Sequence, residues 1–126
     1  MASHATYLSI FNFTNEDINI TVTETDNYDW DGVSRPDHNF NNVTIASEKM
    51  KREREELNAS ARSAWYRMNI SLLNGDEITF RNDQHDALGS FSREYKLEGS
   101  SSGKYNLHQE AADNENKFFI FNKKRS

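Results

Sequence analysis

Apolar and polar residues alternate along most of this chain, and a period of two residues predicts β-strands. Residues 8–10 and 18–23 each alternate leucine, isoleucine or valine with serine, asparagine or threonine. Since successive side chains of a strand point to opposite faces, each segment has one apolar face for a core. Residues 15–17, Asn-Glu-Asp, form a short polar turn between the two segments. We therefore expect these segments to form a hairpin.

A second hairpin is predicted more clearly around Asn74-Gly75. Residues 66–72 place tyrosine, methionine, isoleucine and leucine on one face and arginine, asparagine and serine on the other. Asn-Gly tolerates the positive φ angles of a two-residue turn, and residues 78–80 resume the alternation.

Weaker strand patterns cover residues 91–97, 105–108 and 118–121. Short strands at this spacing are typical of a β-sandwich. We expect an all-β protein, with one antiparallel β-sandwich domain over residues 1–126.

Residues 48–57 do not fit the alternation. They contain strong helix formers, and opposite charges recur four positions apart, so a short helix is one interpretation. Only Met50 and Leu57 are apolar, which leaves a solvated connector or a charged edge strand as alternatives. Glutamates interrupt the basic residues, so a nucleic-acid-binding motif is not expected here.

Composition narrows the function classes. A formal charge of −5 argues against a nucleic-acid partner, since phosphate binding needs clustered basic residues. The chain has no cysteine, which excludes disulfides and thiolate sites. The first residues lack a basic and then apolar signal pattern, so we expect a soluble protein that is cytoplasmic or released without a signal peptide.

Catalytic motifs are not evident in the sequence. His85-Asp86 could orient an imidazole, but no nucleophile-elbow pattern accompanies it. Gly99 and Gly103 enclose serines without the lysine of a phosphate-binding loop. We expect a non-enzymatic protein without a cofactor.

The longest predicted loop, residues 26–42, carries acidic and aromatic side chains together. Asp26, Asp29 and Asp31 could contribute to a calcium site, although acidic loop clusters are more often solvated turns. An EF-hand is excluded because its last ligand position would be His38. Our prediction is therefore that no metal is bound.

Aromatic residues of that loop are candidate ligand-binding groups. Tyr28 and Trp30 could settle at a membrane interface or stack on a sugar, and Trp30 could instead pack inside the sandwich. Trp65 should point away from the apolar face of its strand.

Five Asn-x-Ser/Thr sequons occur at Asn12, Asn19, Asn42, Asn58 and Asn69. We interpret those within strands as products of alternation, with Ile20 and Ile70 inward and the asparagines outward. Asn12 and Thr14 flank a turn, where short polar side chains can bond to local backbone.

Taken in order, these features resemble the aegerolysin family, including its 14-kDa bacterial insecticidal branch. The matching stretches are Phe11-Asn12, Asp17-Ile18-Asn19-Ile20, Asp29-Trp30-Asp31-Gly32, Leu57-Asn58-Ala59-Ser60-Ala61-Arg62-Ser63, and the strand-turn-strand from Ile70 to Arg81. The resemblance covers nearly the whole chain.

The resemblance implies a β-sandwich cytolysin component that binds a membrane lipid and acts with a larger pore-forming protein partner, with a homodimer or heterodimer as a further expectation. Some members recognise sphingolipids. Fungal lipid binders carry a tryptophan-rich segment with cysteine where this chain has residues 82–91, so a sphingolipid is one ligand that the resemblance leaves open and does not specify. The ligand-binding candidates are Tyr28, Asp29, Trp30, Asp31 and Phe91. A sugar-binding lectin, or a protein-interaction subunit that binds neither ligand, are the alternatives.

Overall fold

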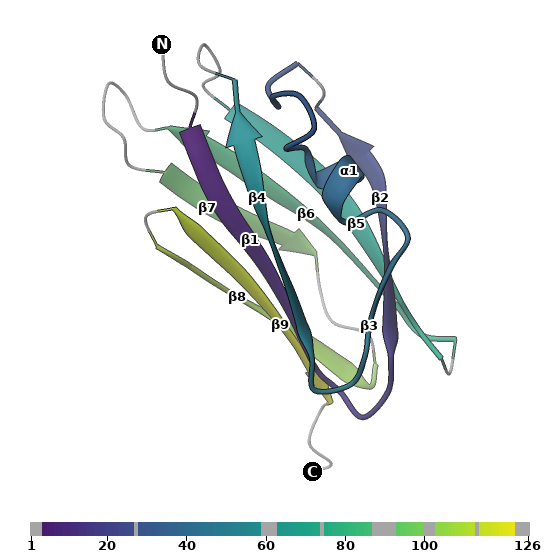
Figure 1. Ribbon diagram of the computed structural model, residues 1–126. Helices are drawn as coiled ribbons and strands as arrows, with labels where there is room; N and C mark the ends of the chain where they lie inside the picture. Colours follow the sequence, from purple (N-terminus) through teal and green to yellow (C-terminus); the bar gives the residue numbers. More distant parts are fainter. Residues whose placement is uncertain are drawn as a thin grey trace.

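A computed structural model describes residues 4–26, 28–58, 63–73, 75–86, 93–99, 103–112 and 114–122 of the protein. These residues form two β-sheets that face each other (Figure 1). One sheet has four strands in the order β4-β1-β9-β8, and the other has five in the order β3-β2-β5-β6-β7. The predicted all-β, single-domain sandwich is confirmed.

The strands are β1 (His4–Phe13), β2 (Ile18–Thr25), β3 (Val43–Ile45), β4 (Met50–Leu57), β5 (Ser63–Leu72), β6 (Glu77–Asp86), β7 (Arg93–Gly99), β8 (Tyr105–Ala112) and β9 (Glu115–Asn122), with one short helix, α1 (Pro36–Asn39). Within each sheet, neighbouring strands pair antiparallel except β1 and β9, which are parallel.

The core forms where the predicted apolar faces meet. Every second residue of β5 is buried, and Ile20 opposes Ile70 in the β2–β5 pair with both side chains fully buried. Asn19 and Asn69 point to the outer face of the sheet, as the sequence indicated. The predicted β5–β6 hairpin is confirmed, and Gly75 has φ of 93°, but the connection is longer than the expected two-residue turn, since the Leu72 N–H donates to the Asp76 carbonyl at 2.9 Å. Asn74 lies outside the described residues.

The predicted hairpin of β1 with β2 is wrong. β1 pairs with β4 and β9, whereas β2 pairs with β3 and β5 in the other sheet, so the turn between them crosses from one sheet to the other. The fully buried Asn12 holds this crossing. Its Nδ2 donates to the carbonyls of Glu16 and Ile45, each at 2.9 Å, and its Oδ1 accepts from the Thr14 backbone N–H at 3.0 Å.

Replacing Asn12 by aspartate should therefore destabilise the fold. A carboxylate cannot donate to two carbonyls, and each unsatisfied buried group costs about 1–3 kcal/mol, so we expect a loss of about 2–6 kcal/mol of unfolding free energy. Urea unfolding of Asn12→Asp would measure it. Asn19→Asp, on the outer face of β2, is the matched control, and equal losses in both variants would contradict this role for Asn12.

Residues 48–57 form neither a helix nor a solvated connector. They contain β4, an edge strand paired along its length with β1, which was the alternative left open. In this pairing the side chains of Glu55 and Leu57 are buried in the interior. The other charged side chains of β4 are exposed or half-buried. The short helix lies instead at Pro36–Asn39, where proline at the first turn favours a helix start.

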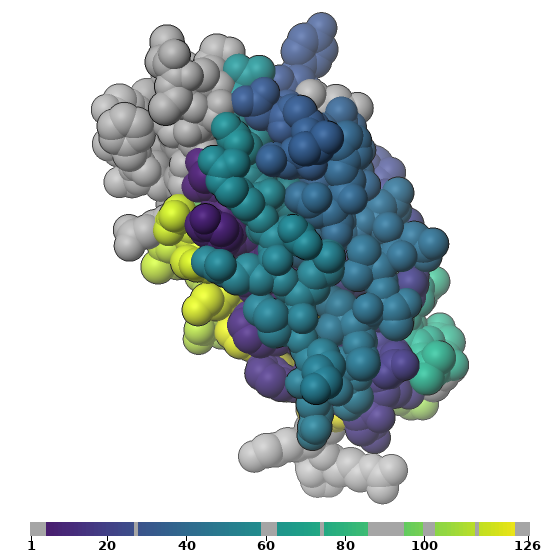
Figure 2. Space-filling model, in the orientation of Figure 1, coloured from purple at the N-terminus to yellow at the C-terminus, as the bar shows by residue number. Residues whose placement is uncertain are grey.

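The two ends of the sandwich are distinct. Figure 1 places the ends of β2 and β4 and the segment before α1 at the top, and the β1–β2 crossing and the β5–β6 turn at the bottom. In Figure 2, residues between β2 and β4 cover the side of the sandwich where edge strands β3 and β4 lie.

Candidate functional site

The segment from residue 28 to residue 35 carries four of the five predicted binding residues and lies along the free edge of β4. Three backbone hydrogen bonds hold it there: the Asp31 N–H donates to Glu56 at 2.8 Å, the Glu56 N–H to Ser34 at 2.9 Å, and the Asn58 N–H to Asp29 at 2.8 Å. Because its backbone is bonded to a strand, this segment has a defined conformation, although the sequence indicated only a long loop.

Of the two alternatives for Trp30, the structure shows the one in which the ring packs inside the sandwich. Only 4% of Trp30 is exposed, its backbone forms a bridge with Leu57, and its ring lies 6.0 Å from the ring of Tyr66. The indole fills the end of the core beneath the segment. Its buried Nε1 has no hydrogen-bond partner among the described residues. Trp30 therefore fixes the segment from below.

Tyr28 is placed very differently from Trp30. It is 91% exposed, and Val33 on the same segment is 76% exposed. The Tyr28 N–H donates to the Asp26 carboxylate at 3.0 Å, which shapes the backbone just before the exposed ring. Two exposed apolar side chains thus lie on a backbone that the sheet holds in place.

The acidic candidates lie close to Tyr28. Burial raises the pKa of the Asp29 carboxyl above its ordinary value, with a further contribution from the nearby negative charge of Asp26. Asp31 is held to β4 by its backbone N–H, which donates to the Glu56 carbonyl. Across the described part of the chain, no group of three or more histidine, aspartate or glutamate side chains is arranged to hold a metal ion. Phe91, the fifth candidate, lies outside the described residues.

A buried carboxyl that the sequence did not reveal lies beneath this region. Glu55 of β4 is 1% exposed, and the Asn39 side chain at the end of α1 donates to both of its oxygens at 3.3 Å. Burial raises the pKa of Glu55 to about 8, and the charges of Glu53 and Asp37 act in the same direction. Glu55 is therefore predominantly protonated at neutral pH.

Amide and hydroxyl side chains join the two sheets in the interior. Asn116 Nδ2 donates to Asn82 Oδ1 at 2.9 Å and to the Tyr66 hydroxyl at 3.2 Å, while Gln84 Nε2 donates to Thr6 Oγ1 at 2.8 Å. Burial raises the pKa of Tyr66 well above its ordinary value, so its hydroxyl stays neutral. These groups satisfy one another, which is the requirement for polar side chains inside a core.

A groove of about 420 Å³ runs between β2 and the segment that follows it, and Trp65 forms part of its wall. Its polar lining residues include Thr23, Glu24, Asp37 and Asn41. Trp65 points away from the core, as predicted. The Arg81 guanidinium lies 4.2 Å from the centre of its ring, so one aromatic surface is already covered.

Sequence reasoning missed an aromatic cluster on the outer face of the four-stranded sheet. Phe11 and Phe13 of β1 stack with Phe119 of β9. The available signal was phenylalanine at every second position at both ends of the chain. Their common position depends on the parallel pairing of β1 with β9, which no local pattern predicts.

Comparison with known proteins supports the fold only. No family model and no curated protein matches the sequence. Among solved structures, the crystal structure of IP-1A from Alcaligenes faecalis is similar, with a TM-score of 0.57, 11% sequence identity, and coverage of 97% of this chain and 94% of that one. None of the helices that the structure describes is long and apolar enough to cross a membrane. The architecture of this chain is thus one that a natural protein of similar length also adopts.

Proposed function

We propose that this protein is a non-enzymatic module that recognises a membrane lipid layer through the segment around Tyr28 and acts with a larger pore-forming protein partner. The observation that carries the proposal is the 91% exposure of Tyr28 on a segment held to β4. The membrane ligand and the pore-forming partner in this proposal come from the resemblance to aegerolysins. In this proposal Tyr28 and Val33 contact the lipid, and Trp30 only supports them.

The physical basis is that tyrosine suits the interface between headgroups and acyl chains, since its ring is apolar and its hydroxyl polar. A held backbone loses little conformational entropy on binding. Asp26 and Asp29 lie close to Tyr28 in the chain, which has a formal charge of −5, so an anionic lipid surface is disfavoured. We therefore propose a zwitterionic or neutral lipid, the sphingolipid type included.

Liposome cosedimentation over a panel of lipid headgroups tests this proposal. Burying one tyrosine ring contributes roughly 1–1.5 kcal/mol, so Tyr28→Ala should weaken binding about five- to tenfold, and the double change with Val33→Ser should weaken it further. Leu73→Ser, at the β5–β6 turn at the opposite end, removes an apolar side chain that is 77% exposed and should have no effect. Unchanged binding in the Tyr28 variants would refute the assignment.

A second candidate function is sugar binding in the groove beside Trp65. Aromatic side chains stack on sugars, and the Asp37 and Asn41 side chains at the groove could bond to hydroxyl groups. The covered face of Trp65 and the existing ion pair of Asp37 with Arg35 at 2.7 Å make this the weaker proposal. A glycan array run beside the liposome panel separates the two, since retention on a glycan without any lipid binding would favour the groove.

A further inference from the structure

The outer face of the four-stranded sheet has an exposed apolar centre. The rings of Phe11 and Phe119 lie 4.8 Å apart and within 13° of parallel, and the Phe13 ring lies 5.9 Å from each of them. Phe13 is 52% exposed, and Met50 of β4, which is paired with Phe11, is 42% exposed. Stacked rings on the solvent side of a sheet are unusual for a face that meets only water.

Strand register arranges this face in rows that run across all four strands. One row, from β4 to β8, is Met50, Phe11, Phe119 and His108, and the next is Arg52, Ser9, Lys117 and Glu110. Toward the ends of β1 and β9, Phe13 is paired with Phe121. The first row is therefore apolar except for His108 at the β8 edge, and the second has a basic residue at the β4 edge and an acidic residue at the β8 edge.

These rows are complementary to themselves under one rotation. A twofold axis that lies between two stacked copies and runs along the strands places β1 over the β9 of the other copy and β4 over its β8. Phe11 then meets Phe119, and Phe13 meets Phe121. Two sheet faces stack at about 10 Å with nearly aligned strands, so rows near the centre stay in register.

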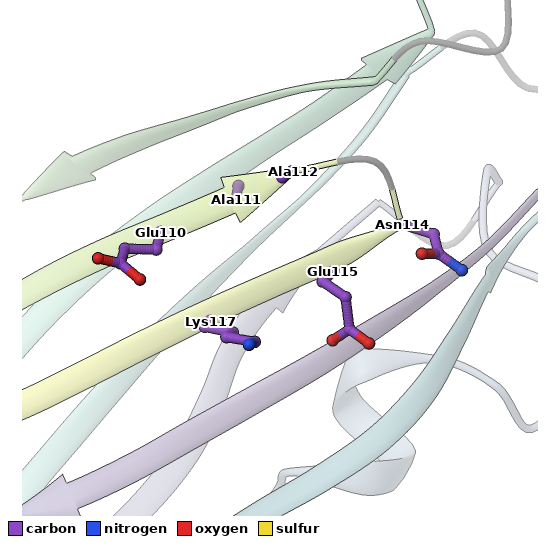
Figure 3. A pocket seen from close by; sticks show the side chains of 6 residues that line it. All are labelled: Glu110, Ala111, Ala112, Asn114, Glu115 and Lys117. Atoms are coloured by element: carbon purple, nitrogen blue, oxygen red, sulfur yellow. The ribbon is translucent and has the colours of Figure 1, made fainter.

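The charged side chains of this face are also complementary under this rotation. Under this rotation Arg52 of one copy faces Glu110 of the other, and the reverse contact forms at the opposite edge. Figure 3 shows Glu110, Lys117 and Glu115 on β8 and β9, lining a shallow hollow of about 330 Å³. Arg52 is paired with Glu115 at 2.6 Å, so charges on the face are largely balanced while the whole chain is acidic. Two copies can approach here with less repulsion than a chain of −5 would otherwise produce.

A twofold axis perpendicular to the strands does not give this charge contact. It would stack β4 on the β4 of the other copy, so Arg52 could not meet Glu110, which lies on β8. The Arg52–Glu110 contact is therefore specific to the axis that runs along the strands.

We propose that this outer face binds a second copy of the chain as a parallel, twofold-symmetric dimer centred on Phe11 and Phe119. Because the axis runs along the strands, both copies direct their Tyr28 segments toward the same side. The dimer would then offer two lipid contacts to one membrane, and the second contact would benefit from a high effective concentration. This consequence, unlike the dimer itself, rests on the proposed function.

Sedimentation velocity over a concentration series tests the dimer in the absence of lipid. The full chain should pass from monomer to dimer, and Phe119→Asp should raise the dissociation constant at least about a hundredfold, since it places two charges at the centre of the interface. Tyr28→Ala, at the far end, should leave the dimer unchanged. A chain that stays monomeric up to millimolar concentration, or a dimer indifferent to Phe119→Asp, would overturn the inference.

Exchanging the charges of Arg52 and Glu110 distinguishes a lost interface from a misfolded variant. Arg52→Glu and Glu110→Arg should each be monomeric alone, because each opposes like charges in both symmetric contacts. Mixing the two variants should restore a dimer, since every contact then joins an acidic and a basic residue. No recovery on mixing, with both variants folded by circular dichroism, would contradict the proposed orientation.

The liposome panel distinguishes this inference from the proposed function. A dimer that binds no lipid leaves the interface standing and removes the membrane role. A monomer that loses lipid binding on Phe119→Asp would assign the aromatic face to the lipid and overturn the dimer.

Discussion

Glu55→Gln is expected to stabilise the protein at alkaline pH relative to the wild type. Burial raises the pKa of Glu55 from 4.5 to about 8, so between these values the folded state keeps a proton that the unfolded state has released. Wild-type stability from this group is therefore fully present below pH 4.5 and is lost as the pH rises to about 8. The loss is about 1.4 kcal/mol per pH unit, on the order of 4–5 kcal/mol in all.

Glutamine has nearly the same shape as glutamate and does not titrate, so the difference in unfolding free energy between the two proteins should grow in favour of the variant from pH 5 to pH 8. Urea unfolding at several pH values measures this slope. Glu98→Gln, on β7 of the other sheet with its carboxylate 3.5 Å from Lys96 Nζ, controls for the removal of one negative charge. A difference that does not change over this range would show that Glu55 titrates like an exposed carboxyl.

Trp30→Ala is expected to cost about 3–5 kcal/mol of unfolding free energy, the range for removing a large buried aromatic side chain. Trp30 is 4% exposed and packs beside Tyr66 and Leu57, so its removal leaves a cavity at the end of the core. The segment held above it should also loosen. Limited proteolysis should then cleave the Trp30→Ala variant within residues 28–35 much faster than the wild type.

Trp30→Phe is the matched control for that experiment. Phenylalanine keeps most of the ring and removes the indole Nε1, which has no partner among the described residues, so the cost should be well below that of alanine. A cost below about 1 kcal/mol for Trp30→Ala would mean that the indole does not support the segment.

Separating Trp30 from Tyr28 changes how mutations in this region should be interpreted. Loss of lipid binding in a Trp30 variant would follow from a displaced segment as readily as from a lost contact. Loss in a Tyr28 variant would report on the ligand, because the side chain is almost fully exposed and supports nothing else.

Features that depend on neighbours in sequence could be predicted. The β5–β6 hairpin follows from a period of two and an Asn-Gly turn, and the inward positions of Ile20 and Ile70 follow from the same period. The sandwich class follows from the number and spacing of such segments. Each of these is specified by interactions within a few residues of the chain.

Features that depend on the choice of strand partner were decided by the fold. A turn after β1 predicts a change of direction, but whether β2 returns beside β1 or crosses to the other sheet depends on which surfaces bury the most apolar area together. For the same reason the mixed charges of residues 48–57 could not identify an edge strand: β4 forms because β1 offers it a complete row of backbone partners.

The candidate site shows the same division. The sequence placed Tyr28, Asp29, Trp30 and Asp31 together, since they are adjacent in the chain. Only packing separates their roles, putting Trp30 into the core and Tyr28 into solvent. The high pKa of Glu55 and the aromatic rows of β1 and β9 arise from strands paired across the length of the chain, because burial and stacking are properties of contacts and local sequence does not encode which contacts form.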